Sequence, residues 1–312
     1  MEALQNMPTP HPFLKWAGGK RQLMSTIDEH LPTGVKDGTI TRYVEPFVGG
    51  GAVFFHIRTK YPVQEFHISD FNPDLINSYI VIRDELDALL DGLQVLADEY
   101  LPLEHAERST VFYRVRVEYN SNRACLESDI IGEERVRRAA QTIFLNRTCF
   151  NGLYRVNSKG DYNVPHGRYR NPPIRDESNL RAVSNALQGV GISCGSYEIC
   201  EPYVDDSTFV YFDPPYRPLP NTPSFTDYAQ KSTFGDDDQR ALAEFFSKLH
   251  VRGAFLMLSN SDPKNTDPDD DFFDELYAGY DLFRVLARRA INSDGKGRGK
   301  ITEILFTNFN AD

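Results

Sequence analysis

Residues 43–51 read Tyr-Val-Glu-Pro-Phe-Val-Gly-Gly-Gly, an apolar run that ends in three consecutive glycines. The apolar part, Tyr43–Phe47, predicts a buried strand, and Ala52–His56 is typical of the start of a helix. Glycine allows a backbone to adopt positive φ and to approach a ligand closely. Nucleotides bind at the C-terminal edge of the first strand in α/β sheets. The stretch therefore predicts a nucleotide-binding loop, although tight strand–helix turns without a ligand contain glycines too.

Several other short apolar runs predict buried strands, and helical patterns lie between them. The further strands are expected at Phe66–Asp70, Thr208–Asp213, Ala254–Asn260, Asp281–Ala287 and Ile301–Asn308. The helices are expected at Pro73–Leu90, Val111–Asn120, Glu134–Leu145 and Asp236–His250. This alternation predicts a doubly wound α/β sheet. Residues 288–300 are too few and too rich in glycine for a crossover helix, so the last two strands should form an antiparallel hairpin at the sheet edge.

The middle of the chain has a different character, which predicts an inserted domain. Residues 91–187 are mainly helical in pattern, and we expect them to separate two parts of the sheet domain, residues 1–90 and 188–312. Between Arg135 and Arg181 there are ten basic and three acidic residues, and residues 284–300 hold six basic and one acidic. Acidic residues gather elsewhere, as in Asp262–Asp271, which we expect to be a mobile surface loop that touches no motif. Charged runs are usually solvated faces, so charge alone leaves a DNA-facing role open.

The bulk composition of the 312 residues is that of an ordinary globular protein, with 40% hydrophobic and 25% charged residues. The formal net charge of −11 argues against nonspecific coating of nucleic acid. No apolar run approaches the roughly 20 residues of a membrane span, and the N-terminus does not resemble a signal peptide, so we expect a cytoplasmic protein. The four cysteines form no Cys-x-x-Cys pair, and we expect free thiols and no metal site.

Two carboxylates are placed at predicted strand ends. Asp70 ends the second strand about twenty residues beyond the first, where an acid accepts hydrogen bonds from a ribose. The alternative role for Asp70 is to cap the helical turn that follows it. The glycines do not follow the G-x-G-x-x-G spacing of dinucleotide sites. The arrangement therefore suits S-adenosyl-L-methionine better than a dinucleotide.

The second carboxylate begins the motif Asp213-Pro214-Pro215-Tyr216, directly after the run FVYF. The exocyclic amine of adenine is a poor nucleophile because its lone pair is delocalised into the ring. A carboxylate and a backbone carbonyl, here Asp213 and Pro214, can accept its two hydrogens and turn the nitrogen toward tetrahedral geometry. Pro215 restricts the backbone, and Tyr216 offers a ring on which an extruded base can stack. The motif therefore predicts methyl transfer to an amine, with positioning and electrostatics as its main sources of rate.

A third motif surrounds the single tryptophan of the chain, in the segment Phe13–Arg21 (FLKWAGGKR). A tryptophan can cover an adenine ring, and a lysine can pair with a carboxylate. A core tryptophan with solvated lysines explains the same residues.

In their order along the chain, FLKWAGGK, EPFVGGG, ISDFN and DPPY, these motifs resemble those of the DNA adenine methylase family, the GATC-methylating type of the D12 class. The resemblance extends from about Pro12 to Asn308. It includes the stretch NRTCFNGLYRVNSKGDYNVPHGRYR at residues 146–170, which is similar to the family's target-recognition region. It implies a Rossmann-like α/β fold of the S-adenosylmethionine-dependent methyltransferases with an inserted, mainly helical recognition domain.

The resemblance also implies roles for individual residues. Residues lining or underlying the cofactor site would be Trp16, Lys20, Glu45, Pro46, Phe47, Gly49, Asp70 and Asp213. Arg155 would read a guanine in the major groove, and Phe150 would fill the space left by a flipped base. The other DNA contacts would be Lys15, Asn151, Leu153, Pro165, Tyr169 and Arg170. Residues 221–234 resemble a segment that becomes ordered on DNA.

The implied partner is double-stranded DNA, and the chain is expected to act as a monomer. Whether a restriction endonuclease specific for the same site accompanies it is left open. Three other functions also fit part of the sequence: methylation of RNA or of a protein glutamine, a noncatalytic DNA-binding regulator, and an NAD-dependent oxidoreductase. The basic middle segment disfavours the first, the intact motifs disfavour the second, and the glycine spacing disfavours the third.

Overall fold

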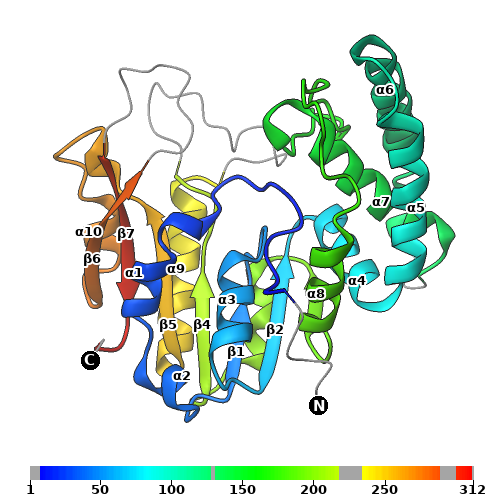
Figure 1. The fold of residues 1–312 in the computed structure, drawn as a ribbon. Coiled ribbons are helices and arrows are strands. Elements are labelled where there is room, and N and C mark those ends of the chain that lie inside the picture. The colour runs from blue at the N-terminus through cyan, green and yellow to red at the C-terminus, as the bar shows by residue number, and fades with distance from the viewer. Residues whose placement is uncertain (1–7, 128–130, 218–233, 289–299, 311–312) are drawn as a thin grey trace.

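The structure is a computed structural model that describes residues 8–127, 131–217, 234–288 and 300–310. Within these residues a seven-stranded sheet has the order β3-β2-β1-β4-β5-β7-β6 (Figure 1). The strands are β1 (Arg42–Glu45), β2 (Glu65–Asp70), β3 (Gly191–Cys194), β4 (Thr208–Phe212), β5 (Phe255–Ser261), β6 (Asp281–Arg288) and β7 (Lys300–Thr307). The first five strands of that order are parallel, and β7 runs antiparallel to both β5 and β6. The predicted doubly wound sheet and its terminal hairpin are thus confirmed.

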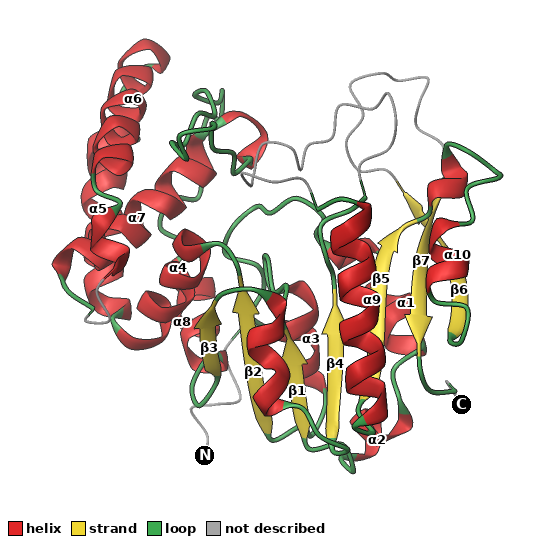
Figure 2. Cartoon of the chain, turned by 180° about the vertical axis from the view of Figure 1, so that it is seen from behind, coloured by secondary structure: helices red, strands yellow, loops and turns green. Residues whose placement is uncertain are grey.

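Helices cover both faces of the sheet. The longer helices are α3 (Ala52–Lys60), α4 (Pro73–Asp84), α5 (Leu86–Tyr100), α6 (His105–Ser121), α7 (Glu133–Thr148), α8 (Glu177–Ala186) and α9 (Asp236–Val251), and the shorter ones are α1 (Met24–Glu29), α2 (Thr33–Asp37) and α10 (Phe272–Leu276). Figure 2 shows α9 across β4 and β5, on the face opposite to α1 and α3. Along β4 every residue is buried, because Phe209 and Tyr211 join the core on the α3 side while Val210 and Phe212 join the core on the α9 side.

The helices α5, α6 and α7 stand beside the sheet, next to the end at which β1, β2 and β4 terminate (Figure 1). Helix α7 packs against α4, α5 and α6, which joins this group to the sheet domain. Helix α8 returns the chain to the sheet, where it packs on α3 and α4 before β3 begins. The residues that follow α7 therefore emerge beside the C-terminal edge of the parallel strands.

One local prediction was wrong, one strand was missed, and the basic run is only partly a surface feature. The helix predicted for Pro73–Leu90 is interrupted at Glu85, whose φ of −132° and ψ of 39° separate α4 from α5. Strand β3 was missed because its four residues are only partly buried and Gly191 opens it. The basic run 135–181 is not uniformly a solvated face, because Arg135 and Arg138 are buried.

The prediction of a mobile surface loop at 262–271 also needs correction, because hydrogen bonds connect this segment to the rest of the fold. Asp262 is only 2% exposed and accepts hydrogen bonds from Arg284 at 3.1 Å and from Thr302 at 2.8 Å. Asp270 accepts one from Arg217 at 2.6 Å, directly after the Asp213–Tyr216 motif. Basic residues from other parts of the chain thus anchor a segment that composition alone marks as a free loop.

The ion pair between Arg138 and Asp74 connects α7 to α4, and its disruption is a direct test of the fold. Arg138 is 1% exposed, and its Nε lies 2.5 Å from Asp74 Oδ1. We expect Arg138→Met to lower the free energy of unfolding by about 3–5 kcal/mol, because Asp74 would stay buried without its cation. Urea denaturation measures this change.

The matched control is Arg181→Met. Arg181 is 47% exposed and pairs with Glu177 at the surface, so its loss should cost no more than about 1 kcal/mol. Equal losses in the two variants would show that the Arg138 pair does not stabilise the fold as described.

Candidate active site

The predicted motifs meet at the C-terminal edge of the sheet. Glu45 and Asp70 end β1 and β2, and Asp213 follows the last residue of β4, so adjacent parallel strands bring their motifs to one edge (Figure 1). The segment 12–20 runs along the same edge, because Trp16 lies against Gly49 and Gly50. Motifs separated by up to about two hundred residues in the sequence therefore form one site.

The glycine loop after β1 is held in a narrow space. Its backbone is fixed by two hydrogen bonds, from Val48 N to Ser69 O at 3.0 Å and from the Tyr79 hydroxyl to Gly49 O at 3.0 Å. Gly51 has a φ of 76°, and a Cβ at this position would lie 2.5 Å from the Tyr79 hydroxyl. Only glycine satisfies both the conformation and the close approach.

Asp70 is held by the same loop. Its Oδ2 accepts a hydrogen bond from Gly49 N at 3.1 Å, and its Oδ1 accepts one from Asn72 N at 2.9 Å. Asn72, and not Asp70, caps α4, because its side chain accepts from the backbone N–H groups of residues 74 and 75. Burial raises the pKa of Asp70 to about 6.

Glu45 lies beneath the loop and is 2% exposed. Its Oε2 accepts a hydrogen bond from the Tyr43 hydroxyl at 2.7 Å. Burial raises the pKa of Glu45 well above its usual value, and the neighbouring carboxylates of Asp213 and Asp70 add to that rise. Phe47, two residues on, packs against the ring of Tyr197 with ring centroids 5.6 Å apart.

Lys20 is the centre of the charged part of the site. Its ammonium lies 2.7 Å from Asp213 Oδ1 and 3.6 Å from Glu303 Oε2, and it donates to the Tyr216 hydroxyl at 2.6 Å. The Tyr216 hydroxyl donates in turn to Glu303 Oε2 at 2.9 Å. Lys20 is only 3% exposed, and although burial alone would lower its pKa, Asp213 and the other oxygens raise it well above the usual value.

Further residues that sequence reasoning missed fix the motif from behind. Ser259 on β5 donates to Asp213 Oδ1 at 3.1 Å, and its hydroxyl lies 2.8 Å from that of Tyr211. Gln239 on α9 is fully buried and donates to Pro215 O at 3.1 Å. A polar residue inside an apolar strand is the signal that marks Ser259. Glu303 lies in strand β7 beside another polar residue, Thr302, and no local pattern distinguishes it.

The residues predicted to contact DNA lie mainly on the segment after α7. Phe150 is 53% exposed, Asn151 is also exposed and has the positive φ of 56°, and Pro165 is exposed beside them, accepting a hydrogen bond from Phe150 N at 2.9 Å. Arg155 donates to Asn163 Oδ1 at 2.6 Å. Leu153 packs against the core at the base of the same turn.

Lys15 and Tyr169, which are also predicted to contact DNA, contact each other and so join this segment to the N-terminal motif. Lys15 Nζ donates to the Tyr169 hydroxyl at 3.1 Å and lies 4.2 Å from the centre of its ring. Trp16 stacks on Tyr154, with ring centroids 5.2 Å apart. Arg170 is exposed, and its backbone carbonyl accepts a hydrogen bond from Arg108 at 2.8 Å. Of the segment 221–234, which resembles one that becomes ordered on DNA, residues 221–233 lie outside the described residues.

Comparison with known proteins connects most of the chain to one family. The family model for D12 class N6 adenine-specific DNA methyltransferases matches residues 16–291. The chain is 50% identical over 299 residues to the type II methyltransferase M.MjaIII of Methanocaldococcus jannaschii, covering 96% of this chain and 99% of that protein. It is 37% identical over 300 residues to the type II methyltransferase M1.LlaDCHI of Lactococcus lactis subsp. cremoris, covering 96% and 95%.

A DNA adenine methylase of Escherichia coli K12 is 35% identical over 293 residues, covering 94% of this chain and 93% of that protein. None of the helices in the described residues combines the length and the apolar character that a membrane crossing requires.

The contact between Gly51 and Tyr79 can be tested by substitution. Gly51→Ala adds both the strain of a left-handed alanine, about 1–2 kcal/mol, and a collision with the Tyr79 hydroxyl that should add about 1–3 kcal/mol. Gly189→Ala is the matched control, because Gly189 has a φ of 75° and nothing within 4 Å of its Cβ position. Urea denaturation should therefore show the larger loss for Gly51→Ala. Tyr79→Phe should reduce the difference, and a difference of zero would contradict the packing.

Proposed function

Because the chain belongs to the D12 class of N6 adenine-specific DNA methyltransferases, we propose that it moves the methyl group of S-adenosylmethionine to the exocyclic amine of an adenine rotated out of duplex DNA. We propose GATC as the site that it methylates. The recognition stretch at residues 146–170, which resembles that of the GATC-methylating type, supports this choice, and the relatives that carry the name DNA adenine methylase support adenine as the methylated base.

The geometry of Asp213 is the observation that carries the proposal. Its Oδ1 is held by Lys20 and Ser259, and in the described part of the chain no hydrogen bond reaches Oδ2. Oδ2 is thus available to one hydrogen of an incoming amine, and the carbonyl of Pro214 is the second acceptor. With both hydrogens accepted, the nitrogen lone pair would no longer be fully delocalised into the ring and would attack the donor's methyl group in line. The bond between that carbon and the donor's sulfur would break with its electron pair left on sulfur, and one amine proton would be released.

Tyr216 would position the base. Its hydroxyl is fixed between Lys20 at 2.6 Å and Glu303 at 2.9 Å, which holds the ring at a set orientation beside Asp213. An aromatic ring fixed in this way offers a stacking surface to an unstacked base. The two prolines between Asp213 and Tyr216 limit the backbone, so the acceptors and the stacking face keep a constant relation.

The residues at the ends of β1 and β2 fit the methyl donor. Asp70 presents a carboxylate suited to a ribose, Phe71 beside it is 63% exposed and offers an apolar face to an adenine ring, and the glycine loop lets the backbone approach. Trp16, Glu45, Pro46, Phe47 and Gly49 would form the remaining walls. When bound, the cofactor supplies an electrophilic methyl group on a sulfonium.

Lys20 would not bind the carboxylate of the cofactor directly. Its ammonium has three hydrogens, and Asp213, Tyr216 and Gly18 O accept hydrogen bonds from it. We propose that Lys20 serves the cofactor site by holding Asp213, which stands between the cofactor and the base.

Residues 91–187 would form the target-recognition domain, and residues 1–90 and 188–312 the catalytic domain. Arg155 would read a guanine, which a bidentate arginine contact suits, and the exposed ring of Phe150 would enter the stack in place of the flipped base. Lys15, Asn151, Leu153, Pro165, Tyr169 and Arg170 would complete the contacts. Duplex DNA is then the macromolecular partner, and we place the reaction in the cytoplasm.

Removal of the acceptor carboxylate tests the proposed chemistry. We expect Asp213→Ala to lower turnover on GATC duplexes by at least roughly 10²-fold, because one of the two acceptors and its charge are lost. DNA binding at fixed salt should change little, since phosphate contacts dominate affinity. Transfer of radiolabelled methyl groups and a gel shift measure the two effects.

Asp237→Ala, at an exposed position on α9, is the control and should behave like the wild type. An Asp213→Ala protein that methylates at near wild-type rate would show that the acceptor lies elsewhere.

The raised pKa of Asp70 predicts how cofactor affinity depends on pH. A ribose requires the ionised carboxylate, and the pKa of about 6 means that this form is lost as the pH falls through 6. Affinity should therefore be constant above about pH 7 and fall by up to about tenfold per pH unit below 6. Fluorescence of Trp16, the single tryptophan, can follow binding because its ring lies against the glycine loop. Asp70→Asn should bind weakly and lose this pH dependence, and a wild-type affinity that does not fall below pH 6 would contradict the assigned role.

A further inference from the structure

The N-terminal segment 11–15 is held by two buried asparagines in the same way. Asn179 on α8 accepts from His11 N at 3.0 Å and donates to His11 O at 3.0 Å. Asn146 on α7 accepts from Lys15 N at 2.8 Å and donates to Lys15 O at 2.9 Å. Their exposed fractions are 3% and 1%. Each amide thus pairs with the backbone of one residue, as a neighbouring strand would.

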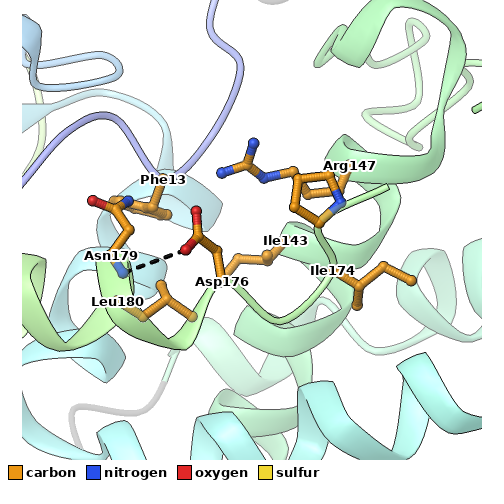
Figure 3. Close-up of a pocket in the computed structure, with 8 residues that line it drawn as sticks. Phe13, Ile143, Arg147, Ile174, Asp176, Asn179 and Leu180 are labelled. Atoms are coloured by element: carbon orange, nitrogen blue, oxygen red, sulfur yellow. Dashed lines mark hydrogen bonds between the residues drawn. The ribbon is translucent and has the colours of Figure 1, made fainter. Parts of the chain in front are cut away.

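The two asparagines differ in what else they contact. Asn179 lies near the start of α8, beside Phe13 and Asp176 (Figure 3). Its own backbone N–H donates to Asp176 Oδ1 at 3.4 Å. Asn146 uses its second amide hydrogen to donate to Gly152 O at 2.9 Å. Asn146 therefore ties the N-terminal segment to the turn at residues 150–153, whereas Asn179 ties it only to α8.

A second contact strengthens the connection between Lys15 and this turn. The side chain of Lys15 fills the place of a side chain at Gly152, where a Cβ would lie 2.2 Å from Lys15 Cδ. Gly152 also has a φ of 65°, and Asn151 before it has a φ of 56°, so two successive residues hold left-handed conformations. Such a turn persists only where its surroundings determine it. Asn146 and Lys15 are part of those surroundings, together with Pro165 and Tyr162, whose contacts hold Phe150 N and Leu153 O.

The N-terminal segment continues from Lys15 into the active site. Trp16 stacks on Tyr154 and lies against the glycine loop, and Lys20 lies 2.7 Å from Asp213 Oδ1. The turn that carries Phe150 and Asn151 is thus joined to the acceptor carboxylate through a single run of six residues. Among the described residues, Asn146 is the only one whose side-chain amide hydrogen-bonds both to this run, at Lys15, and to the turn, at Gly152.

We propose that Asn146 is a positioning residue that couples the reading of the DNA sequence to methyl transfer. The inference rests on the proposed function, in which the turn at 150–153 contacts bases. A correct site would set the turn, Asn146 would transmit that setting to Lys15, and Lys20 would hold Asp213 in the productive geometry. A misplacement of about 1 Å at a reacting group can cost roughly 10²-fold in rate, so a small shift along this path is enough.

The test compares Asn146→Asp with Asn179→Asp. Aspartate has the shape of asparagine but cannot donate, so in each variant a carboxylate oxygen faces the carbonyl that the amide served. Both proteins should lose stability, which urea denaturation measures. Single-turnover methylation of a GATC duplex and of duplexes with one altered base pair is then measured at saturating protein, at a temperature where both variants are folded.

We expect Asn146→Asp to methylate GATC at least roughly tenfold more slowly, while its rate on altered sites stays near that of the wild type. The ratio of the two rates should fall accordingly. Asn179→Asp should keep the wild-type ratio, because its amide does not reach the turn. Asn146→Ser, which replaces the two amide N–H donors by one shorter hydroxyl without adding a charge, should give the same direction and serves if Asn146→Asp does not fold.

Equal slowing of Asn146→Asp on every duplex would mean a structural role only and would overturn the inference, as would an unchanged ratio. The same fall in the ratio for Asn179→Asp would also overturn it, since general loosening of the N-terminal segment would then explain both variants. A wild-type protein that methylates all duplexes alike would overturn the proposed function, and this inference with it. A selective wild type with a selective Asn146→Asp variant would overturn the inference alone.

Discussion

Lys20 lies 2.7 Å from the carboxylate of Asp213, and both side chains are largely withdrawn from water. A buried carboxylate without a cation would take up a proton, and a buried ammonium without a carboxylate would lose one. Each therefore fixes the charge of the other, and Tyr216 and Glu303 bind to the same ammonium. The N-terminal segment, the end of β4 and strand β7 are held at one edge of the sheet by this one cation.

Much of the fold could be predicted from the sequence, because buried strands and glycine turns have strong local patterns. The strands that flank the glycine loop and the terminal hairpin follow from apolar runs and from a linker too short for a helix. The break at Glu85 and the strand Gly191–Cys194 could not be predicted, since they depend on packing rather than on composition. The acidic segment 262–271 was misjudged for the same reason, because its partners Arg217 and Arg284 are distant in the sequence.

For the site, motifs predicted which side chains meet, but not how they are held. Asp213 and Tyr216 both lie within hydrogen-bonding distance of Lys20, so the N-terminal motif meets the Asp213–Tyr216 motif. Glu303 has no motif of its own, and its place is fixed only by the register that sets β7 beside β5. Asn146 is likewise one polar residue on a helix until the fold brings Lys15 to it from 131 residues away. Contacts of this kind are set by tertiary structure, which a single sequence does not state.

The central claim is that this edge of the sheet holds an extruded adenine with its amine directed at a methyl donor. The most direct test is the mapping of modified bases in the DNA of a bacterial host that lacks adenine methylation and expresses the wild-type protein. The account predicts N6-methyladenine at one short palindrome, GATC, on both strands, with other adenines unmodified. Genomic DNA without methylated adenine, despite abundant folded protein, would contradict it.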